Sequence, residues 1–265
     1  MSDVRAEIAV IGGSGFYEFL GSPTDVPMST PYGDPSAAVS IGQVNGRAVA
    51  FLPRHGRRHE FPAHRVNYRA NLWALRSLGV RRILAPCAVG SLQPELGPGA
   101  VVVPDQLVDR TTSRVQTFFD AGACHVGFAD PYCPSLRHSL TAADDEIVDG
   151  GAMVVIEGPR FSTRAESQWY AAQGWSIVNM TGHPEAVLAR ELALCYAAIA
   201  LVTDRDAGIS GGEAVSQAEV FAAFADNLER LRDLLVGVID KLPDTRTGCA
   251  CEHSLDGFDL PVTLP

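Results

Sequence analysis

The chain has 265 residues, of which 46% are hydrophobic and 20% are charged, and its formal net charge at pH 7 is −10. This composition fits one large domain with an ample core, whereas a nucleic acid or an anionic membrane would attract a basic face. We therefore expect no nucleic-acid partner and no membrane partner. The apolar runs are too short to span a bilayer and no secretory leader pattern opens the chain, which predicts a cytoplasmic protein.

Short apolar segments with strand character alternate with helical patterns, which predicts an α/β fold in which helices cover a sheet. A helix is predicted over residues 68–79, and a longer helix starts at a capping box of Ser216 and Glu219 and continues to Val238. We expect one domain over residues 1–242 and a C-terminal tail over residues 243–265, which forms an arm or an ill-ordered end. The predicted strands span residues 6–12, 47–53, 80–86, 100–104, 152–157, 175–180 and 197–203.

The first predicted strand runs into a glycine-rich loop, in the sequence IAVIGGSGFY at residues 8–17. Glycines in such a loop let backbone N–H groups approach an anion. A dinucleotide-binding fingerprint needs a third glycine where Glu18 stands, and an ATP-binding loop needs a lysine, which this chain has only at Lys241. The loop therefore indicates either a site for another kind of phosphate or a strand-exit turn without a ligand.

A basic cluster, PRHGRRH at residues 53–59, follows the second predicted strand. Arg54 and His55 at this strand exit offer three donors to a mobile anion, whereas the other basic residues of the cluster are expected to solvate a loop. A zinc site made of His55, His59 and His64 has the right spacing but no fourth ligand, so we do not expect one.

Two acidic residues, Asp204 and Asp206, follow the last predicted strand in the sequence LVTDRDAG at residues 201–208. The two-residue period of a strand puts them on the same side of the backbone, and their repulsion favours a proton on one of them at neutral pH. The pair indicates a ligand or metal site, although a solvated acidic loop is the common alternative. Phe161 precedes a helix cap at Thr163 and offers a platform for stacking a planar ligand.

The tail contains three residues that bind metals in other proteins, Cys249, Cys251 and His253. Three ligands do not close a tetrahedral structural zinc site, and a disulfide between cysteines two residues apart would be strained. We therefore expect no metal here and a dispensable tail, with the cysteines of the chain present as free thiols.

Together these motifs resemble the trimeric class of purine nucleoside phosphorylases, and within it the 5′-methylthioadenosine phosphorylase branch. The resemblance runs from Ile8 to about Lys241 and implies a single α/β domain with a central mixed sheet surrounded by helices. It also implies a homotrimer with each active site near a subunit boundary, and no metal or organic cofactor. The motifs that carry it, in chain order, are IGGSGFY, PRHGRRH, VNYRANLWAL, GSL, VVPDQLVDRT, IEGPRFSTRAES, NMTGHPEAVLARE and TDRDAG.

The resemblance gives the glycine loop a ligand, since it implies a site for inorganic phosphate as the second substrate. Cys87 stands where family members closest to the eukaryotic pattern have a threonine, so no side-chain contact to phosphate is expected there. The phosphate contacts that the resemblance implies are Ser14, Arg54, His55, Thr181 and the backbone of Ala88.

The residue types allow the implied reaction to be rebuilt. When an N-glycosidic bond breaks, positive charge develops on the sugar and negative charge on the base, so phosphate attacks C1′ while a general acid near N7 stabilises the leaving base. Asp206 fits the acid if Asp204 and burial raise its pKa, while Asp204 stays ionised and helps to hold the base. Two carboxyl groups suit the amino group and N7 of adenine better than the O6 acceptor of hypoxanthine or guanine.

The substrate contacts that the resemblance implies include Val220 and Phe221 at the 5′ group, with His125 from a neighbouring subunit, and Met180 under the ribose. Phe161, Asn179 and Thr203 complete this set. We expect phosphorolysis of 5′-methylthioadenosine to adenine and 5-methylthioribose 1-phosphate, a pentosyltransferase reaction of purine and methylthio salvage. The alternatives are a phosphorylase of 6-oxopurine nucleosides or methylthioinosine, a hydrolase that uses water, and a nucleoside-binding protein without activity.

Overall fold

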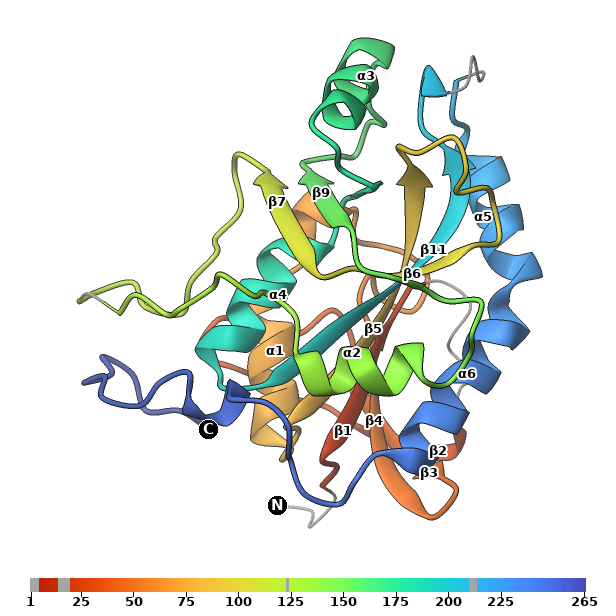
Figure 1. Ribbon diagram of the computed structural model, residues 1–265. Helices are drawn as coiled ribbons and strands as arrows, with labels where there is room; N and C mark the ends of the chain where they lie inside the picture. Colours follow the sequence, from red (N-terminus) through yellow and green to blue (C-terminus); the bar gives the residue numbers. More distant parts are fainter. Residues whose placement is uncertain (1–4, 14–19, 123, 210–213) are drawn as a thin grey trace.

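The computed structural model describes residues 5–13, 20–122, 124–209 and 214–265 (Figure 1). Each of the seven strands predicted from the sequence overlaps an observed strand. The strands are β1 (Ile8–Gly12), β2 (Gly21–Val26), β3 (Val39–Val44), β4 (Arg47–Pro53), β5 (Arg82–Ser91), β6 (Val101–Val103), β7 (Gln106–Arg110), β8 (Val148–Asp149), β9 (Ala152–Ile156), β10 (Ile177–Asn179) and β11 (Cys195–Arg205). The helices are α1 (Tyr68–Ser77), α2 (Pro134–Thr141), α3 (Arg164–Ala172), α4 (Gly182–Glu191), α5 (Gln217–Asp226) and α6 (Leu228–Lys241), with 3-10 turns η2 (Ala63–Arg65) and η4 (Cys251–His253).

Three of the strands that the sequence did not predict, β2, β7 and β8, lack buried residues. Without a buried face a strand needs no apolar run or alternation, so its sequence carries no such signal. The expectation of an α/β fold with a mixed sheet and surrounding helices is confirmed.

The described strands form one mixed sheet of 11 strands, whose main path runs β2-β3-β4-β1-β5-β10-β9-β7. Its branch point is β5, which pairs in parallel with both β1 and β11 and antiparallel with β10 near its end. Because β4 is also parallel to β1, the carboxyl ends of β1, β4, β5 and β11 reach the same edge. In open sheets of this kind ligands bind at that edge.

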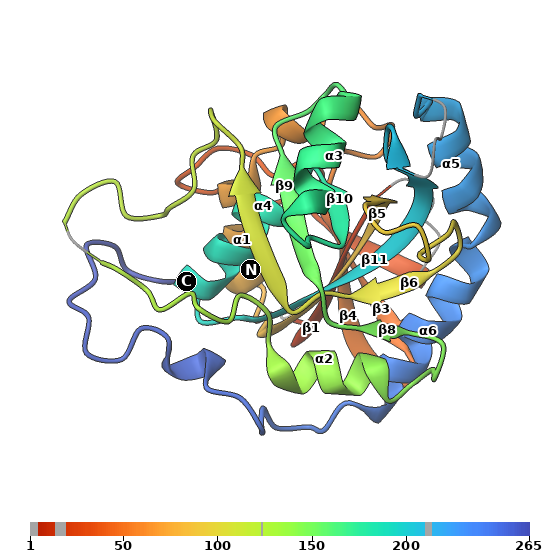
Figure 2. The same ribbon diagram turned by 45° about the horizontal axis from the view of Figure 1, so that its top comes forward.

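Helices cover both faces of the sheet (Figures 1 and 2). The side chains of β1 alternate between two cores: Ala9 and Ile11 belong to the core that α1 and α4 cover, whereas Ile8 and Val10 belong to the core that α2 and α6 cover. The alternation follows from the two-residue period of a strand whose two faces are both buried. No helix in the described part of the chain is long and apolar enough to cross a membrane.

The long helix predicted at the end of the domain is two helices, α5 and α6, separated at Asn227. The predicted cap is present, since Ser216 Oγ accepts a hydrogen bond of 3.3 Å from the Glu219 N–H. At the break, the Asn227 side chain donates to the carbonyl of Ala223 and competes with the helical ladder. The prediction of a continuous helix was therefore wrong, and α5 leaves Phe221 41% exposed instead of in the core.

The tail after α6 packs against the domain. Arg82 donates hydrogen bonds to the carbonyls of Pro243 and Asp244, and Arg246 donates to the carbonyl of Ala193. Cys251 is only 5% exposed and belongs to the core that includes α6. The tail is therefore ordered against the domain and not an ill-ordered end, while the expectation that it is dispensable stays a prediction.

Candidate active site

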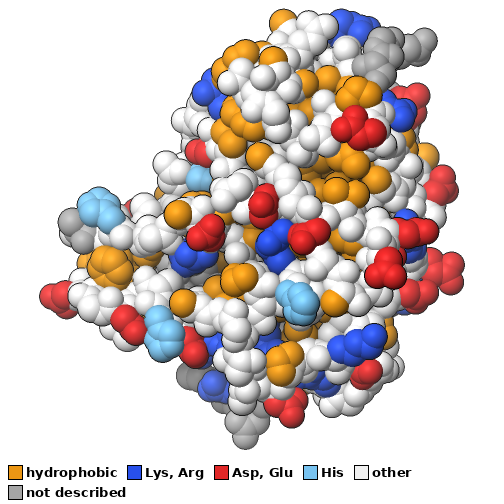
Figure 3. Space-filling view, in the orientation of Figure 1, with side chains coloured by type: hydrophobic (Ala, Val, Ile, Leu, Met, Phe, Trp, Pro, Cys, Tyr) orange, Lys and Arg blue, Asp and Glu red, His pale blue; other side chains and the backbone are white. Residues whose placement is uncertain are grey.

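The residues predicted for catalysis and phosphate binding lie mostly at the carboxyl ends of the parallel strands. Arg54 follows β4, Ala88 lies in the second half of β5, and Asp204 and Asp206 stand at the end of β11. Ser14 follows β1 and lies outside the described residues. In Figure 3, which has the orientation of Figure 1, hydrophobic side chains gather on the upper part of the molecule, around α3 and the ends of β5 and β11.

Arg54 is buried, 1% exposed, and is held by a carboxylate that the sequence did not predict. Its Nε and Nη2 donate to the two carboxylate oxygens of Glu185 at 2.7 and 2.8 Å. Two further N–H groups donate to the carbonyls of Pro86 and Ile11. Burial alone would lower the pKa of Arg54, but the Glu185 carboxylate raises it above its ordinary value. One of the five guanidinium N–H groups, on Nη1, has no acceptor among the residues that the structure describes.

Glu185 lies in α4 and is completely buried. It also accepts a 2.8 Å hydrogen bond from the hydroxyl of Tyr196. A bidentate pair of this kind is rigid, and breaking it would leave an uncompensated charge in the core. Glu185 shares the stretch NMTGHPEAVLARE with a second acid, Glu191, and no local pattern identifies it as the partner of Arg54.

The imidazole ring of His55 is uncharged, and a hydrogen bond to the backbone carbonyl of Phe61 fixes its position. Its Nδ1 lies 2.8 Å from the carbonyl of Phe61, and because a carbonyl only accepts, Nδ1 carries the proton. Burial, helped by the charge of Arg54, lowers the pKa of His55 to about 3. The neutral ring therefore presents Nε2 as an acceptor.

Asn179 organises the turn that carries Thr181. Its Oδ1 accepts hydrogen bonds from the N–H groups of Thr181 and Gly182 at 2.7 and 2.6 Å, and its Nδ2 donates to the carbonyl of Ala88 at 3.0 Å. Thr181 is the N-cap residue of α4. The structure thus brings Ala88 and Thr181 together, as predicted, with Asn179 as the link between them. Nearby Cys87 is buried, and burial raises the pKa of its thiol to about 12.

The two carboxyl groups at the end of β11 differ in their partners. Asp206 is 2% exposed, and its Oδ2 accepts a 2.6 Å hydrogen bond from the Ser167 hydroxyl. Asp204 accepts through Oδ2 from Thr203 Oγ1 at 2.8 Å, while its buried Oδ1 has no hydrogen-bond partner among the described residues. Burial raises the pKa of Asp204 to about 6, with a further contribution from Asp206. The sequence-based expectation placed the raised pKa on the other member of the pair.

Two features around the pair were not predicted. Ser167 lies in α3 and donates its hydroxyl to Asp206, which is 39 residues away in the sequence. A local sequence pattern cannot predict a contact between residues so far apart. Gly90 in β5 leaves space beside the pair, because a Cβ there would lie 3.1 Å from Asp204 Oδ1 and 3.3 Å from Asp206 Cβ. The glycine of the GSL motif therefore lies against the two acids.

The predicted nucleoside contacts are only partly brought together. Met180 packs on Gly158, where a Cβ would approach its sulfur to 2.7 Å, so the segment that holds Phe161 and the segment that holds Met180 adjoin. Phe221 meets the ring of His59 edge-on at 5.5 Å, and His59 stacks on His55 at 4.5 Å.

The remaining predicted contacts lie toward solvent. Val220 is half-buried in α5. His125 is exposed on the long connection between β7 and α2, which extends from the body beside the tail in both ribbon views (Figures 1 and 2). The structure of one chain does not bring His125 to the site. It leaves that residue available to a neighbouring molecule.

Comparisons with known proteins show the family of the chain. A family model described as the phosphorylase superfamily matches residues 7–240. An S-methyl-5′-thioadenosine phosphorylase of Mycobacterium tuberculosis is 62% identical over 259 residues, which cover 97% of each chain. A purine nucleoside phosphorylase of Streptomyces coelicolor is 56% identical over 276 residues, covering 99% of each. The solved structure of a methylthioadenosine phosphorylase of Schistosoma mansoni in complex with adenine is 38% identical with a TM-score of 0.85, over 89% of this chain and 91% of that one.

Proposed function

The chain belongs to the phosphorylase superfamily, and from this premise we propose that it is a pentosyltransferase that cleaves 5′-methylthioadenosine with inorganic phosphate. The products are adenine and 5-methylthioribose 1-phosphate, so the enzyme serves purine and methylthio salvage. Relatives named as S-methyl-5′-thioadenosine phosphorylases, at up to 62% identity over nearly the whole chain, support this activity. We propose that the reaction needs no organic cofactor and no catalytic metal.

The observation that carries the proposal is the incomplete hydrogen bonding of the acidic pair. A buried carboxylate oxygen without a partner is costly, and Asp204 Oδ1 is such an atom at the end of β11. An amino group on a purine would satisfy it. Adenine offers that donor at C6 and an acceptor at N7, which together match two neighbouring carboxyl groups that share a proton.

In the proposed reaction, phosphate oxygen attacks C1′ and the N-glycosidic bond breaks, with its electron pair passing to the purine. The base takes up a proton at N7, which neutralises the charge that develops on it. We propose that Asp206, oriented by Ser167, faces N7 and passes to it a proton taken up from solvent, while ionised Asp204 accepts a hydrogen bond from the amino group at C6.

The proposed phosphate site uses the groups at the ends of β1, β4, β5 and β10. The free Nη1–H of Arg54 donates to a phosphate oxygen, and neutral His55 accepts through Nε2 from the hydroxyl of monoprotonated phosphate. Thr181, the backbone of Ala88 and Ser14 complete the set that the family resemblance implies. The Glu185 carboxylate prevents the guanidinium from moving with the ligand, because both of its oxygens are engaged.

We propose that the 5′-methylthio group contacts Phe221 and Val220, with Phe161, Met180, Asn179 and Thr203 around the base and ribose. Phe221 supports an apolar contact, since it is 41% exposed and lies against the His55–His59 stack. His125 would come from a neighbouring subunit of a homotrimer. Cysteines that are all unbonded are consistent with action in the reducing cytoplasm.

A phosphorylase of 6-oxopurine nucleosides or methylthioinosine is the second candidate. It is favoured by one observation: with a pKa of about 6, Asp204 is protonated in mildly acidic solution and then offers a donor to O6. The similarity to a protein named purine nucleoside phosphorylase also fits this candidate.

The test is base release from four nucleosides, 5′-methylthioadenosine, adenosine, methylthioinosine and inosine, each with and without phosphate. Phosphate-dependent release of adenine, fastest from the methylthio substrate, is the expected result. Faster turnover of inosine or methylthioinosine would assign the enzyme to the second candidate. Base release without phosphate would indicate a hydrolase, and binding without turnover of any nucleoside would contradict the proposal.

A further inference from the structure

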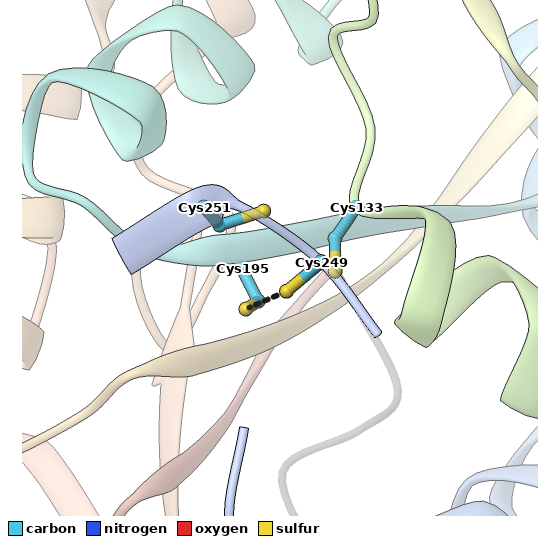
Figure 4. A group of neighbouring side chains, drawn as sticks. All are labelled: Cys133, Cys195, Cys249 and Cys251. Atoms are coloured by element: carbon cyan, nitrogen blue, oxygen red, sulfur yellow. Dashed lines mark hydrogen bonds between the residues drawn. The ribbon is translucent and has the colours of Figure 1, made fainter. Parts of the chain in front are cut away.

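Four cysteines from three distant parts of the chain meet at the amino end of β11 (Figure 4). The four sulfur atoms of Cys133, Cys195, Cys249 and Cys251 all lie within 4.8 Å of one another, and those of Cys195 and Cys249 are 3.6 Å apart. This thiol cluster is the one group with metal-ligand geometry in the part of the chain that the structure describes. The two tail cysteines noted in the sequence are thus joined by two cysteines from the domain.

The backbone brings the thiols together through hydrogen bonds of its own. Cys133 is the N-cap residue of α2, and its N–H donates to the carbonyl of Tyr196 in β11 at 2.8 Å. The N–H of Cys195 donates to the carbonyl of Arg81 at 2.9 Å. On the tail, Arg246 and Ser254 bond to carbonyls of the connection into β11 and of α4. The site is therefore built by the fold and does not depend on one flexible loop.

The spacing of the sulfur atoms suits a tetrahedral metal better than disulfides. A Zn–S bond of about 2.3 Å places the sulfur atoms of a tetrahedral site about 3.8 Å apart, close to the 3.6 Å between Cys195 and Cys249. A disulfide needs a separation of about 2.0 Å. All six cysteines of the chain are unbonded, and three of the four cluster members are buried to 5% exposure or less.

His253, the third candidate ligand in the sequence, is excluded. Its side chain is 62% exposed and its Nδ1 lies 2.9 Å from the carboxylate of Asp256. Two arginines, Arg82 and Arg246, line the same small cavity as three of the cysteines. Four thiolates around a divalent ion carry a net charge of −2, and these guanidinium groups would offset part of it.

We propose that Cys133, Cys195, Cys249 and Cys251 bind one Zn²⁺ ion in a closed, four-thiolate structural site that fastens the tail to the domain. Binding replaces the four thiol protons with four Zn–S bonds and releases the protons to solvent. The site has no open coordination position and lies about 30 Å from Asp204, because nine residues of extended β11 separate them. It therefore serves stability and takes no part in phosphorolysis.

The test starts with the metal content of the untagged enzyme purified in reducing buffer without chelators. One zinc per chain is expected, and a Cys249→Ser, Cys251→Ser double variant should contain none. Cys124→Ser is the matched control, because Cys124 is half-buried outside the cluster, and it should retain the metal. Cobalt loaded in place of zinc should show the sulfur-to-metal charge-transfer bands of four thiolates, and these bands should be lost in the double variant.

The double variant should also lose thermal stability while it keeps most of its turnover at low temperature, since the site is remote from the reaction. Two results would overturn the proposal. One is a reduced protein that takes up no zinc from a zinc-buffered solution. The other is a native mass lower by about four daltons than the reduced chain, which would identify two disulfides in place of the metal.

Discussion

At its first residue β11 joins the thiol cluster, and at its last residues it carries the acidic pair. Around Cys195 the strand register is regular, and remote segments of the same chain supply the neighbouring ligands. Around Asp204 the register with β5 shifts, and one buried carboxylate oxygen lacks a partner among the described residues. At one end of the strand the chain supplies all four ligands of the proposed zinc site, whereas the unpartnered oxygen at the other end suits a substrate.

The two ends of β11 therefore have different tasks in our proposals: the amino end contributes to stability and the carboxyl end to function. A group whose partners all come from the chain contributes to the folded state, whereas a group left unsatisfied costs stability and is retained for binding. Asp206 variants at the carboxyl end should therefore change activity more than stability, whereas variants of the buried Arg54–Glu185 pair should change both.

The largest effect is expected at Asp206. Asp206→Asn keeps an acceptor for the Ser167 hydroxyl but removes the carboxyl that the proposed mechanism places at N7, so kcat/KM for 5′-methylthioadenosine should fall on the order of 10²- to 10⁴-fold. The melting temperature should change little. Asp240→Asn, at an exposed position of α6, is the matched control and should be silent. A variant that binds nucleoside more weakly but turns over normally would contradict the role assigned to Asp206.

The buried pair of Arg54 and Glu185 should affect stability as well as activity, because Arg54 also belongs to the proposed phosphate site. Arg54→Ala leaves the Glu185 charge buried and unpaired, so we expect a loss of about 3–5 kcal/mol in the free energy of unfolding. Activity measurements on this variant alone would then report on unfolding. The Arg54→Met, Glu185→Leu double variant removes both charges and should recover much of the stability.

The effect of added phosphate on the stability of the double variant shows whether that variant still binds phosphate. Phosphate stabilises a protein that binds it in the folded state, so it should raise the urea midpoint of the unsubstituted enzyme but not that of the double variant. Nucleoside binding should survive in both proteins. Equal loss of phosphate binding and nucleoside binding would refute the assignment of Arg54 to the phosphate site.

Asp204 connects stability with function, because the raised pKa of this proposed substrate-binding group predicts a cost to the stability of the folded protein. Its pKa is raised from 3.8 when unfolded to about 6 when folded, so the folded state binds the proton more tightly and stability falls as pH rises from about 4 to 6. Above pH 6 the full cost is present. Asp204→Asn should therefore stabilise the protein by about 3 kcal/mol at pH 8 and by little at pH 4. Urea unfolding at the two pH values measures this difference, and an equal effect at both would contradict the shift.

Much of the carboxyl end could be predicted from the sequence, because strand exits have local signatures. Arg54, Asp204 and Asp206 follow apolar runs, and the structure places all three at one sheet edge. Glu185 and Ser167 could not be predicted, because each acquires its role from a partner 131 or 39 residues away. The thiol cluster was missed for the same reason, since the tail shows only half of its ligands.

The break between α5 and α6 has a different cause. The spacing of apolar residues continues through Asn227, so periodicity predicts one helix, and only the competing side-chain bond of Asn227 to the carbonyl of Ala223 ends it. Exposed strands such as β2 were not predicted, because a strand without buried residues needs no alternation of apolar and polar residues.

The smallest expected effect concerns base preference. Ionised Asp204 accepts a hydrogen bond from an amino group, while protonated Asp204 donates one to O6. The ratio of kcat/KM for inosine to that for adenosine should therefore rise about tenfold as pH falls from 7.5 to 5, the worth of one hydrogen bond of about 1.4 kcal/mol. The midpoint should lie near the Asp204 pKa of about 6.

The ratio of the two kcat/KM values isolates the effect of Asp204. Both nucleosides use the same ribose contacts, the same phosphate site and His55, so any pH dependence of those groups cancels in the ratio. In Asp204→Asn the amide does not titrate, so the ratio should be flat with pH and should favour inosine, since the amide can donate to O6 at every pH. A ratio that changes equally in the enzyme and in this variant would assign the effect to the purine itself. A ratio that is flat in both would show that Asp204 does not contact the C6 substituent, and the adenine preference would then need another source.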